Sequence, residues 1–209
     1  MRTASALLVL ALVATGVSGQ VLRRPVGWKV RFDRADATES ELRSFVAMPP
    51  GWHITTGPAA IFWNPHDRAS GRFRVDMEVH LFDPDGLREG FGVFFGGRQL
   101  EGLEASYAYF LIRDGHQFII KTRTGTRTST VQPWTTSPAV RAYADREQEV
   151  SVRNVLTVEC GEKRVRFLVN GERVAAVSRG EIPTDGVVGL RVGHHVNVHV
   201  TRLEVKPIG

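Results

Sequence analysis

Apolar and polar residues alternate strictly over long stretches of this chain. In residues 70–82 every even position from 74 to 80 is polar, and the odd positions are apolar: Phe73, Val75, Met77, Val79 and Leu81. Successive side chains of a β-strand point to opposite faces of its sheet, so this period of two gives one dry face and one wet face. The stretch therefore predicts a strand of an antiparallel sheet that is packed on one side.

Similar runs follow at short intervals, over residues 91–95, 107–113, 117–123, 155–160, 165–171, 173–178, 186–192 and 196–205. Turn-forming residues separate them at 114–115, 160–163, 170–171 and 185–186. Asn170-Gly171 is typical of a two-residue hairpin, with a second strand from about Arg173 to Ser178. Ten or more strands with such regular turns predict an all-β fold, an antiparallel two-sheet jelly-roll sandwich.

Only two segments depart from this pattern. Residues 33–45 hold the one helical patch, where Asp36 or Thr38 is suited to cap a short turn. Residues 130–149 contain two prolines and little alternation, which predicts a long surface connection across one edge of the sheets.

The first residues have the order of a secretory signal peptide. One arginine precedes an unbroken apolar run from Ala6 to Ala14, and small residues end the segment at Gly19. The run is too short to span a bilayer. We therefore expect a signal peptide over residues 1–19, one sandwich domain over residues 20–209, no transmembrane segment after cleavage, and a secreted or periplasmic protein.

The charge distribution and the cysteine content argue against nucleic-acid binding and against an internal disulfide. The chain has 27 Lys and Arg and 22 Asp and Glu, and its basic residues are scattered singly along strands. This spacing does not favour nucleic-acid binding, which uses clustered basic residues along phosphates. Cys160 is the only cysteine, so no internal disulfide forms, and its place at the end of an alternating strand indicates a buried thiol.

Several of these stretches together resemble a known fold family. They are "PPGWHITTGPAAIFW", "GRFRVDMEVHLF", "FGVFFGG", "YFLIRDG", "NVLTVEC", "VRFLVNGERV" and "DGVVGLRVG". The chain resembles the concanavalin A-like lectin and glucanase sandwiches, which include LamG-like modules, and in particular the exported bacterial domains of the 3-keto-disaccharide hydrolase type. The resemblance covers about residues 40–206 and implies a carbohydrate partner.

The resemblance also implies candidate catalytic groups. The glucanase branch carries Glu-x-Asp-x-x-Glu on one strand, and the nearest positions here are Asp76 and Glu78, with His80 near the place of the third carboxylate. Glu101 and Glu104 form a second acidic pair, and His195 is a further candidate acid or base. The simpler interpretation is that Asp76 and Glu78 form the wet side of a strand.

Two other sets of polar residues are candidate metal ligands, and each has a simpler structural explanation. Asp83, Asp85 and Gly86 resemble part of a calcium loop, but calcium needs six to eight oxygen ligands, so a plain turn is favoured and no metal site is assigned. In residues 190–201, an unbroken strand would place His195 and His199 on one face about 13 Å apart, too far for one metal ion. Alternatively, Gly193 and His194 form a turn that leaves both neighbouring histidines at a loop tip.

Aromatic side chains give the candidate ligand-binding residues. Tyr107, Tyr109 and Arg113 lie on one side of their predicted strand, opposite Ala108, Phe110 and Ile112, and Trp134 is a further candidate. Sugars stack on aromatic rings while charged and amide groups bind their hydroxyls. The alternative is that these rings only pack the core.

These observations favour an exported lectin-like sandwich without a complete catalytic motif. A glycoside or 3-keto-glycoside hydrolase or lyase is the alternative, so the chain is not assigned as an enzyme or a non-enzyme. A structural or protein-binding module of the envelope is the third hypothesis.

Overall fold

The computed structural model describes residues 24–209, and the signal peptide expected over residues 1–19 lies outside them. Fourteen strands form two antiparallel sheets of seven. Sheet A contains, in spatial order, β1 (Lys29–Phe32), β4 (Ala60–Ala69), β13 (Gly186–Val192), β6 (Phe91–Arg98), β7 (Ser106–Arg113), β8 (Gln117–Thr124) and β9 (Arg127–Thr136). This confirms the predicted all-β antiparallel sandwich.

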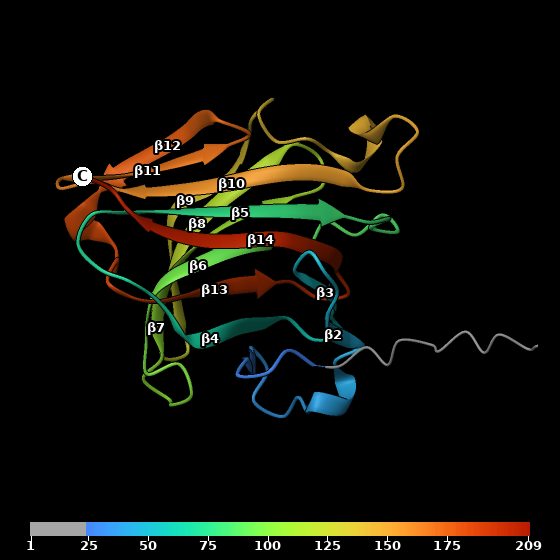
Figure 1. Cartoon of the computed structure of the whole chain (residues 1–209), viewed down its shortest axis with the longest axis horizontal. Helices are drawn as coiled ribbons and strands as arrows, with labels where there is room; N and C mark the ends of the chain where they lie inside the picture. The colour runs from blue at the N-terminus through green and yellow to red at the C-terminus, as the bar shows by residue number, and fades with distance from the viewer. Residues whose placement is uncertain (1–23) are drawn as a thin grey trace, which may run out of the picture.

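Sheet B contains β12 (Glu172–Ser178), β11 (Arg164–Val169), β10 (Val152–Cys160), β5 (Phe73–Leu81), β14 (Asn197–Pro207), β3 (Trp52–Thr55) and β2 (Ser44–Ala47). Figure 1 shows β10, β5 and β14 side by side, as their pairing requires. The sheets meet where β5 contacts β6 and β14 contacts β4.

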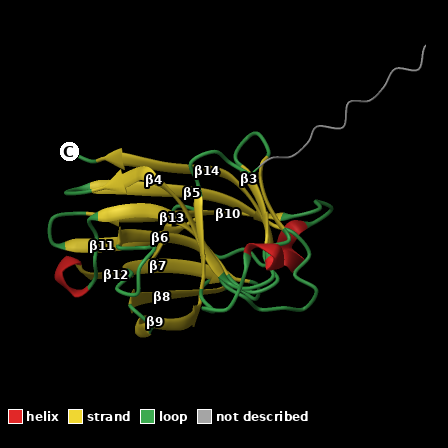
Figure 2. Ribbon diagram, turned by 90° about the horizontal axis from the view of Figure 1, so that it is seen from below, coloured by secondary structure: helices red, strands yellow, loops and turns green. Residues whose placement is uncertain are grey.

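In the described part of the chain, helical structure is limited to three 3-10 turns at the ends of the sandwich (Figure 2): η1 (Glu39–Glu41), η2 (Tyr143–Arg146) and η3 (Arg179–Glu181). Thr38 is the N-cap of η1, as the sequence predicts. The Thr38 backbone N–H donates to the Glu41 carboxylate. Within residues 24–209 no helix has the length and apolarity needed to span a bilayer.

The core lies between the two sheets and follows the alternation in the sequence. All five odd-numbered residues of β5 are buried and the polar residues between them are half-buried on the outer face. Rings from both sheets meet in the middle: Phe110 of sheet A and Phe167 of sheet B have centroids 5.2 Å apart at 61°. This edge-on geometry suits the opposite charges of ring face and ring edge.

The hairpin at Asn170-Gly171 confirms the turn prediction. The two residues have φ angles of 50° and 85°, as the turn that matches the twist of paired strands requires. The Asn170 side chain also accepts from the Val155 N–H at 2.8 Å and donates to the Ala139 carbonyl at 2.8 Å. The turn is therefore fixed to both β10 and the loop after β9.

The prediction of a loop over residues 130–149 is wrong in its first part, because β9 continues to Thr136 as the edge strand of sheet A. Thr128 and Thr130 pair with Arg123 and Lys121 of β8. Pro133 has no N–H to donate, but an edge strand tolerates this because one side of it has no neighbour. The rest of the segment is the predicted connection, with η2 inside it.

The His195 region forms a loop, not a continuous strand. β13 ends at Val192 and β14 begins at Asn197, and His195 has φ 55°. Its N–H donates to the Gly57 carbonyl at 3.0 Å. Of the two alternatives in the sequence, the loop is the one observed, with its turn at His194 and His195 and not at Gly193 and His194.

Candidate functional site

The outer face of sheet A carries a second apolar cluster in addition to the main core. The cluster contains Ile61, Trp63, Phe94, Leu100, Tyr107, Tyr109, Leu111, Ile119 and Val187, with the half-buried Trp134 packed against it. Alternation explains its origin, because Ala108, Phe110 and Ile112 of β7 enter the main core and the residues between them must point outward. All nine residues are buried, so the cluster is a small second core on this side of the sheet, and Trp134 is its half-buried margin.

An ion-pair network covers one part of this cluster. Asp33 follows β1 and accepts hydrogen bonds from the guanidinium groups of Arg191, at 2.9 Å, and Arg123, at 3.1 Å. A second Arg191 nitrogen binds the other Asp33 oxygen, so the contact is bidentate. Only 12 % of the Arg191 side chain and 11 % of the Arg123 side chain are exposed.

The same network fixes the two tyrosines. Arg191 donates to the Tyr107 hydroxyl at 3.3 Å, and its guanidinium carbon lies 4.7 Å from the centre of the Tyr109 ring. Burial raises the pKa of both phenols, against the opposing effect of the Arg191 charge, so both remain protonated at neutral pH. Burial also pushes the pKa of Asp33 upward, but the hydrogen bonds and charge of Arg191 outweigh it and hold that pKa below its usual value.

Side chains of two other strands, β7 and β8, fix the position of the Trp134 ring. The Arg113 guanidinium lies 4.0 Å above its ring centre and is fixed by hydrogen bonds of 2.9 and 2.7 Å to the Gln117 side chain. The ring therefore has one face covered by a cation, and it is positioned by β7 and β8.

Between these groups the face is hollowed into a cavity of about 180 Å³. Its apolar wall is formed by Tyr109, Leu111, Ile119 and Trp134, and its polar wall by Asp33, Glu89, Lys121, Arg191 and His194. His194 and Glu89 face each other, with 3.6 Å between Nδ1 and Oε2. Among the described residues nothing forms a hydrogen bond or ion pair with the Lys121 ammonium group, which leaves one cation available beside two aromatic rings.

The structure thus brings together all four sequence-predicted ligand residues on one face, although Tyr107 is buried beneath Arg191 and only Tyr109 and Trp134 line the cavity. Sequence reasoning missed Asp33, Glu89, Lys121 and His194 as members. Lys121 alternates with the buried Ile120 in β8, so its strand position alone could have indicated it. Asp33 is 158 positions from Arg191, and no local pattern connects them.

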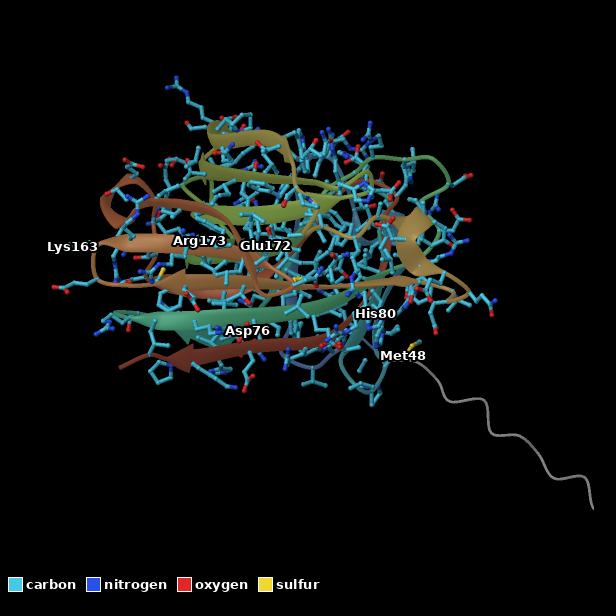
Figure 3. All side chains as sticks on the ribbon, turned by 90° about the horizontal axis from the view of Figure 1, so that it is seen from above. Met48, Asp76, His80, Lys163, Glu172 and Arg173 are labelled. Atoms are coloured by element: carbon cyan, nitrogen blue, oxygen red, sulfur yellow. The ribbon has the colours of Figure 1, made fainter. Side chains whose placement is uncertain are left out.

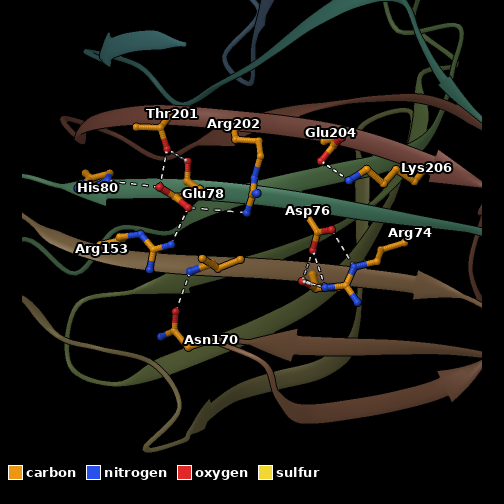
Figure 4. Close-up of polar contacts among 12 residues, drawn as sticks. Arg74, Asp76, Glu78, His80, Arg153, Asn170, Thr201, Arg202, Glu204 and Lys206 are labelled. Carbon is orange, nitrogen blue, oxygen red and sulfur yellow. Dashed lines mark hydrogen bonds and ion pairs between the residues drawn. The ribbon is translucent and has the colours of Figure 1, made fainter. Parts of the chain in front are cut away.

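Three of the sequence-predicted catalytic candidates lie on the other sheet. Asp76 and His80 project from β5 on the outer face of sheet B (Figure 3), and Glu78 lies between them. Figure 4 shows that each carboxylate is bound by arginine: Arg74 donates to Asp76 at 2.7 and 2.9 Å, and Arg153 donates to Glu78 at 2.6 Å.

These contacts keep both carboxylates ionised. Burial raises the pKa of Asp76, but the bonds from Arg74 and Thr157 outweigh it and the pKa is lowered. The bond from Arg153 lowers the pKa of Glu78. Neither group is therefore prepared to donate a proton at neutral pH, and His195, in the β13–β14 loop, contacts neither of them within the described structure.

The remaining acidic candidates have simple roles. Glu101 lies in the β6–β7 loop and pairs with Lys29 at 2.6 Å, and Glu104 is exposed. Asp83 accepts from the Asp85 N–H at 2.9 Å, which closes a local turn. Across residues 24–209 no group of three His, Cys, Asp or Glu side chains is arranged to hold a metal ion.

No protein-family model and no curated protein sequence matches this chain. Solved structures do match it. The carbohydrate-binding module CBM66 from Bacillus subtilis aligns with a TM-score of 0.62 at 12% identity, covering 86% of this chain and 95% of the module. A Bacillus subtilis protein of unknown function with a galectin-like fold has a TM-score of 0.60 at 10% identity, covering 86% and 89%.

The exoplasmic/lumenal domain of VIP36, solved in a Ca²⁺/Man-bound form, has a TM-score of 0.60 at 8% identity, covering 87% of this chain and 83% of that domain. These identities are too low to show more than the fold. The chain has a concanavalin A-like, galectin-like β-sandwich fold.

Proposed function

We propose that this protein binds saccharides in the cavity on the outer face of sheet A. The observation that carries the proposal is the arrangement of Tyr109 and Trp134 beside Lys121 and the Asp33–Arg191 pair. Aromatic rings accept the apolar faces of sugar rings, and fixed charged groups bind the hydroxyls around them.

The fixed geometry of the charged wall supports binding. Arg191 and Asp33 hold each other in place, so a ligand does not have to order them. CBM66 is by its name a carbohydrate-binding module, which agrees with the proposal at the level of the fold. With the signal peptide expected over residues 1–19, binding takes place in the periplasm or outside the cell.

Hydrolysis of glycosides is the weaker alternative. The arginines bound to Asp76 and Glu78 hold both groups as carboxylates, so neither of them is the proton donor that glycoside cleavage needs. The resemblance to 3-keto-disaccharide hydrolases therefore stays a prediction from the sequence, and turnover of 3-keto-disaccharides would test it.

The test of saccharide binding uses a glycan array followed by calorimetric titration of each glycan that responds. Trp134→Ala should weaken binding at least about tenfold, since a lost stacking ring costs about 1.4 kcal/mol or more. Tyr143→Ala is the matched control. Tyr143 also carries a stacked arginine, with the Arg146 guanidinium carbon 3.8 Å from its ring centre, but it does not line the cavity. Equal affinities of the two variants, or no response to any glycan, would overturn the proposal.

A further inference from the structure

A second and larger cavity lies on the same face of sheet A, at the opposite end of β13. It measures about 360 Å³, and its apolar floor is formed by Trp63, Leu100 and Val187. Val187 pairs with Arg68 of β4 and with Gly97 of β6, and Lys29 of β1 pairs with Trp63. The strand pairing therefore places Lys29 and Arg68 over the same surface as the apolar floor.

The walls of this cavity carry an excess of positive charge. Lys29, Arg68 and Arg98 line it, against one carboxylate, Glu101. Glu101 is already bound to Lys29 at 2.6 Å. Arg98 uses its Nε to donate to the Asp185 carbonyl at 3.1 Å, and its terminal nitrogens have no partner among the described residues.

Arg68 is exposed, and its side chain makes no hydrogen bond or ion pair within the described structure. The outer face of sheet B differs, because there Arg74 and Arg153 each bind a carboxylate. Unpaired cations gathered in a concave site attract anions, and the low-dielectric floor beneath them strengthens that attraction.

We infer that this second cavity, defined by Lys29, Arg68 and Arg98, is a subsite for the carboxylate or sulfate groups of an acidic glycan, an inference that rests on the proposed saccharide binding. The planar guanidinium groups of Arg68 and Arg98 suit both oxyanions, which accept two parallel N–H bonds. The apolar floor receives the sugar ring that carries the anion.

The distance between the cavities sets the size of the ligand. The second cavity lies at Val187 and the first at Arg191 and at Gly193, just after the end of β13, so they are four to six positions apart along the chain. At the usual rise of a strand this is about 13–20 Å. Gly189 of β13 and its partner Phe94 of β6 lie between them. A chain of several sugar units spans both sites, whereas a monosaccharide occupies one.

The test compares ligands that differ only in charge. Oligogalacturonates and their methyl esters form one pair, and dextran sulfate and dextran form the other, so the two arms separate carboxylate from sulfate. The acidic member should bind about three- to tenfold more tightly, the gain expected from two partly exposed charge pairs. The difference should shrink as NaCl rises from about 0.05 M to about 0.5 M.

Variants separate the subsite from general attraction to a basic protein. Arg68→Gln with Arg98→Gln should reduce the affinity for the acidic ligand to that of its neutral partner. The matched control is Arg164→Gln with Arg166→Gln, which removes the same charge from exposed positions on sheet B and should leave the preference intact.

Three results would overturn the inference. Equal affinity for acidic and neutral partners would remove the subsite but leave the proposed function standing. Equal behaviour of the two double variants would assign the preference to net charge alone. Equally tight binding of a single-stranded oligonucleotide, lost in Arg68→Gln with Arg98→Gln, would assign the cavity to phosphate chains. Absence of binding to every saccharide would instead defeat the proposed function itself.

Discussion

Asp33 is the residue on which the charged wall of the first cavity depends. Its carboxylate binds two guanidinium groups from strands at different positions in sheet A, and both arginine side chains are almost fully buried. Removing one partner of a buried ion pair leaves the other charge buried without a counter-charge. The resulting loss of folding free energy exceeds the net stabilisation that the pair itself provides. The same residue also keeps the Arg191 guanidinium over the Tyr109 ring.

Asp33→Asn should therefore lower the free energy of unfolding by about 2 kcal/mol. Urea denaturation at pH 7 measures this loss. Asp36→Asn is the control, since its side chain is 78 % exposed and pairs with Arg34 at the surface; it should change stability by less than about 0.5 kcal/mol. Equal losses in the two variants would contradict the structural role of Asp33.

Part of the candidate site could be predicted from single residues. The alternation of β7 correctly places Tyr107, Tyr109 and Arg113 on one face, because strand periodicity is a local property. It does not reveal that Tyr107 is buried under Arg191, since that contact joins residues 84 positions apart. Trp134 was selected for its chemistry, and only the pairing of β9 with β8 explains how it reaches the cavity.

Three neighbouring strands of sheet B bring histidines into one row. His199 of β14 lies directly opposite His53 of β3 and His80 of β5. The His53 and His199 rings have centroids 6.0 Å apart, and the His199 Nε2 contacts the Pro50 carbonyl at 2.9 Å. Positive charges on neighbouring rings would repel each other, so this row disfavours protonation of His53 and His80.

This row predicts a pH dependence of stability. Burial, with the neighbouring His199, lowers the pKa of His53. Burial also lowers the pKa of His80, against the opposing charge of Glu78 and with smaller contributions from His199 and Arg153. The unfolded chain then binds more protons than the folded one as pH falls through about 6.5. The free energy of unfolding should fall from neutral pH through that value and level off below the folded-state pKa values.

Urea titrations between about pH 7.5 and pH 5 measure this slope, above the more acidic range in which Asp33, Asp76 and Glu78 titrate. His53→Gln with His80→Gln should flatten it, whereas His66→Gln, at an exposed position, should not. A stability that rises toward pH 5 would contradict the assignment.

At the level of elements, the long alternating strands are predictable and the short ones are not. β5, β10 and β14 each repeat the alternation several times, and one buried face fixes their register. β1, β2 and β3 have four residues each, too few to establish a period. β4 contains four consecutive buried residues and Pro65, so it does not alternate although it lies inside sheet A.

For the molecule as a whole, the single thiol reports on the integrity of the sandwich. Cys160 is fully buried at the end of β10, and burial raises the pKa of its thiol to about 12. A thiol reacts as the thiolate and must be reached by the reagent. In the folded protein both conditions fail.

An aromatic disulfide reagent at about pH 8 should therefore label Cys160 only when the protein unfolds, and the labelled fraction should follow the urea transition seen by tryptophan fluorescence. Ser70→Cys, at an exposed position, supplies the accessible control and should react at once. Rapid labelling of Cys160 without urea would show that the sheets separate locally.

β9 is one of the two edge strands of sheet A, and an edge strand can pair with a strand of a second molecule. β9 is exposed along this edge, and Pro133 interrupts its row of backbone donors. A strand from another copy cannot form a continuous row of backbone hydrogen bonds with this edge. Edge-to-edge growth into fibres is therefore disfavoured. The proline that obscured this strand in the sequence thus protects the edge of the sheet against pairing with another molecule.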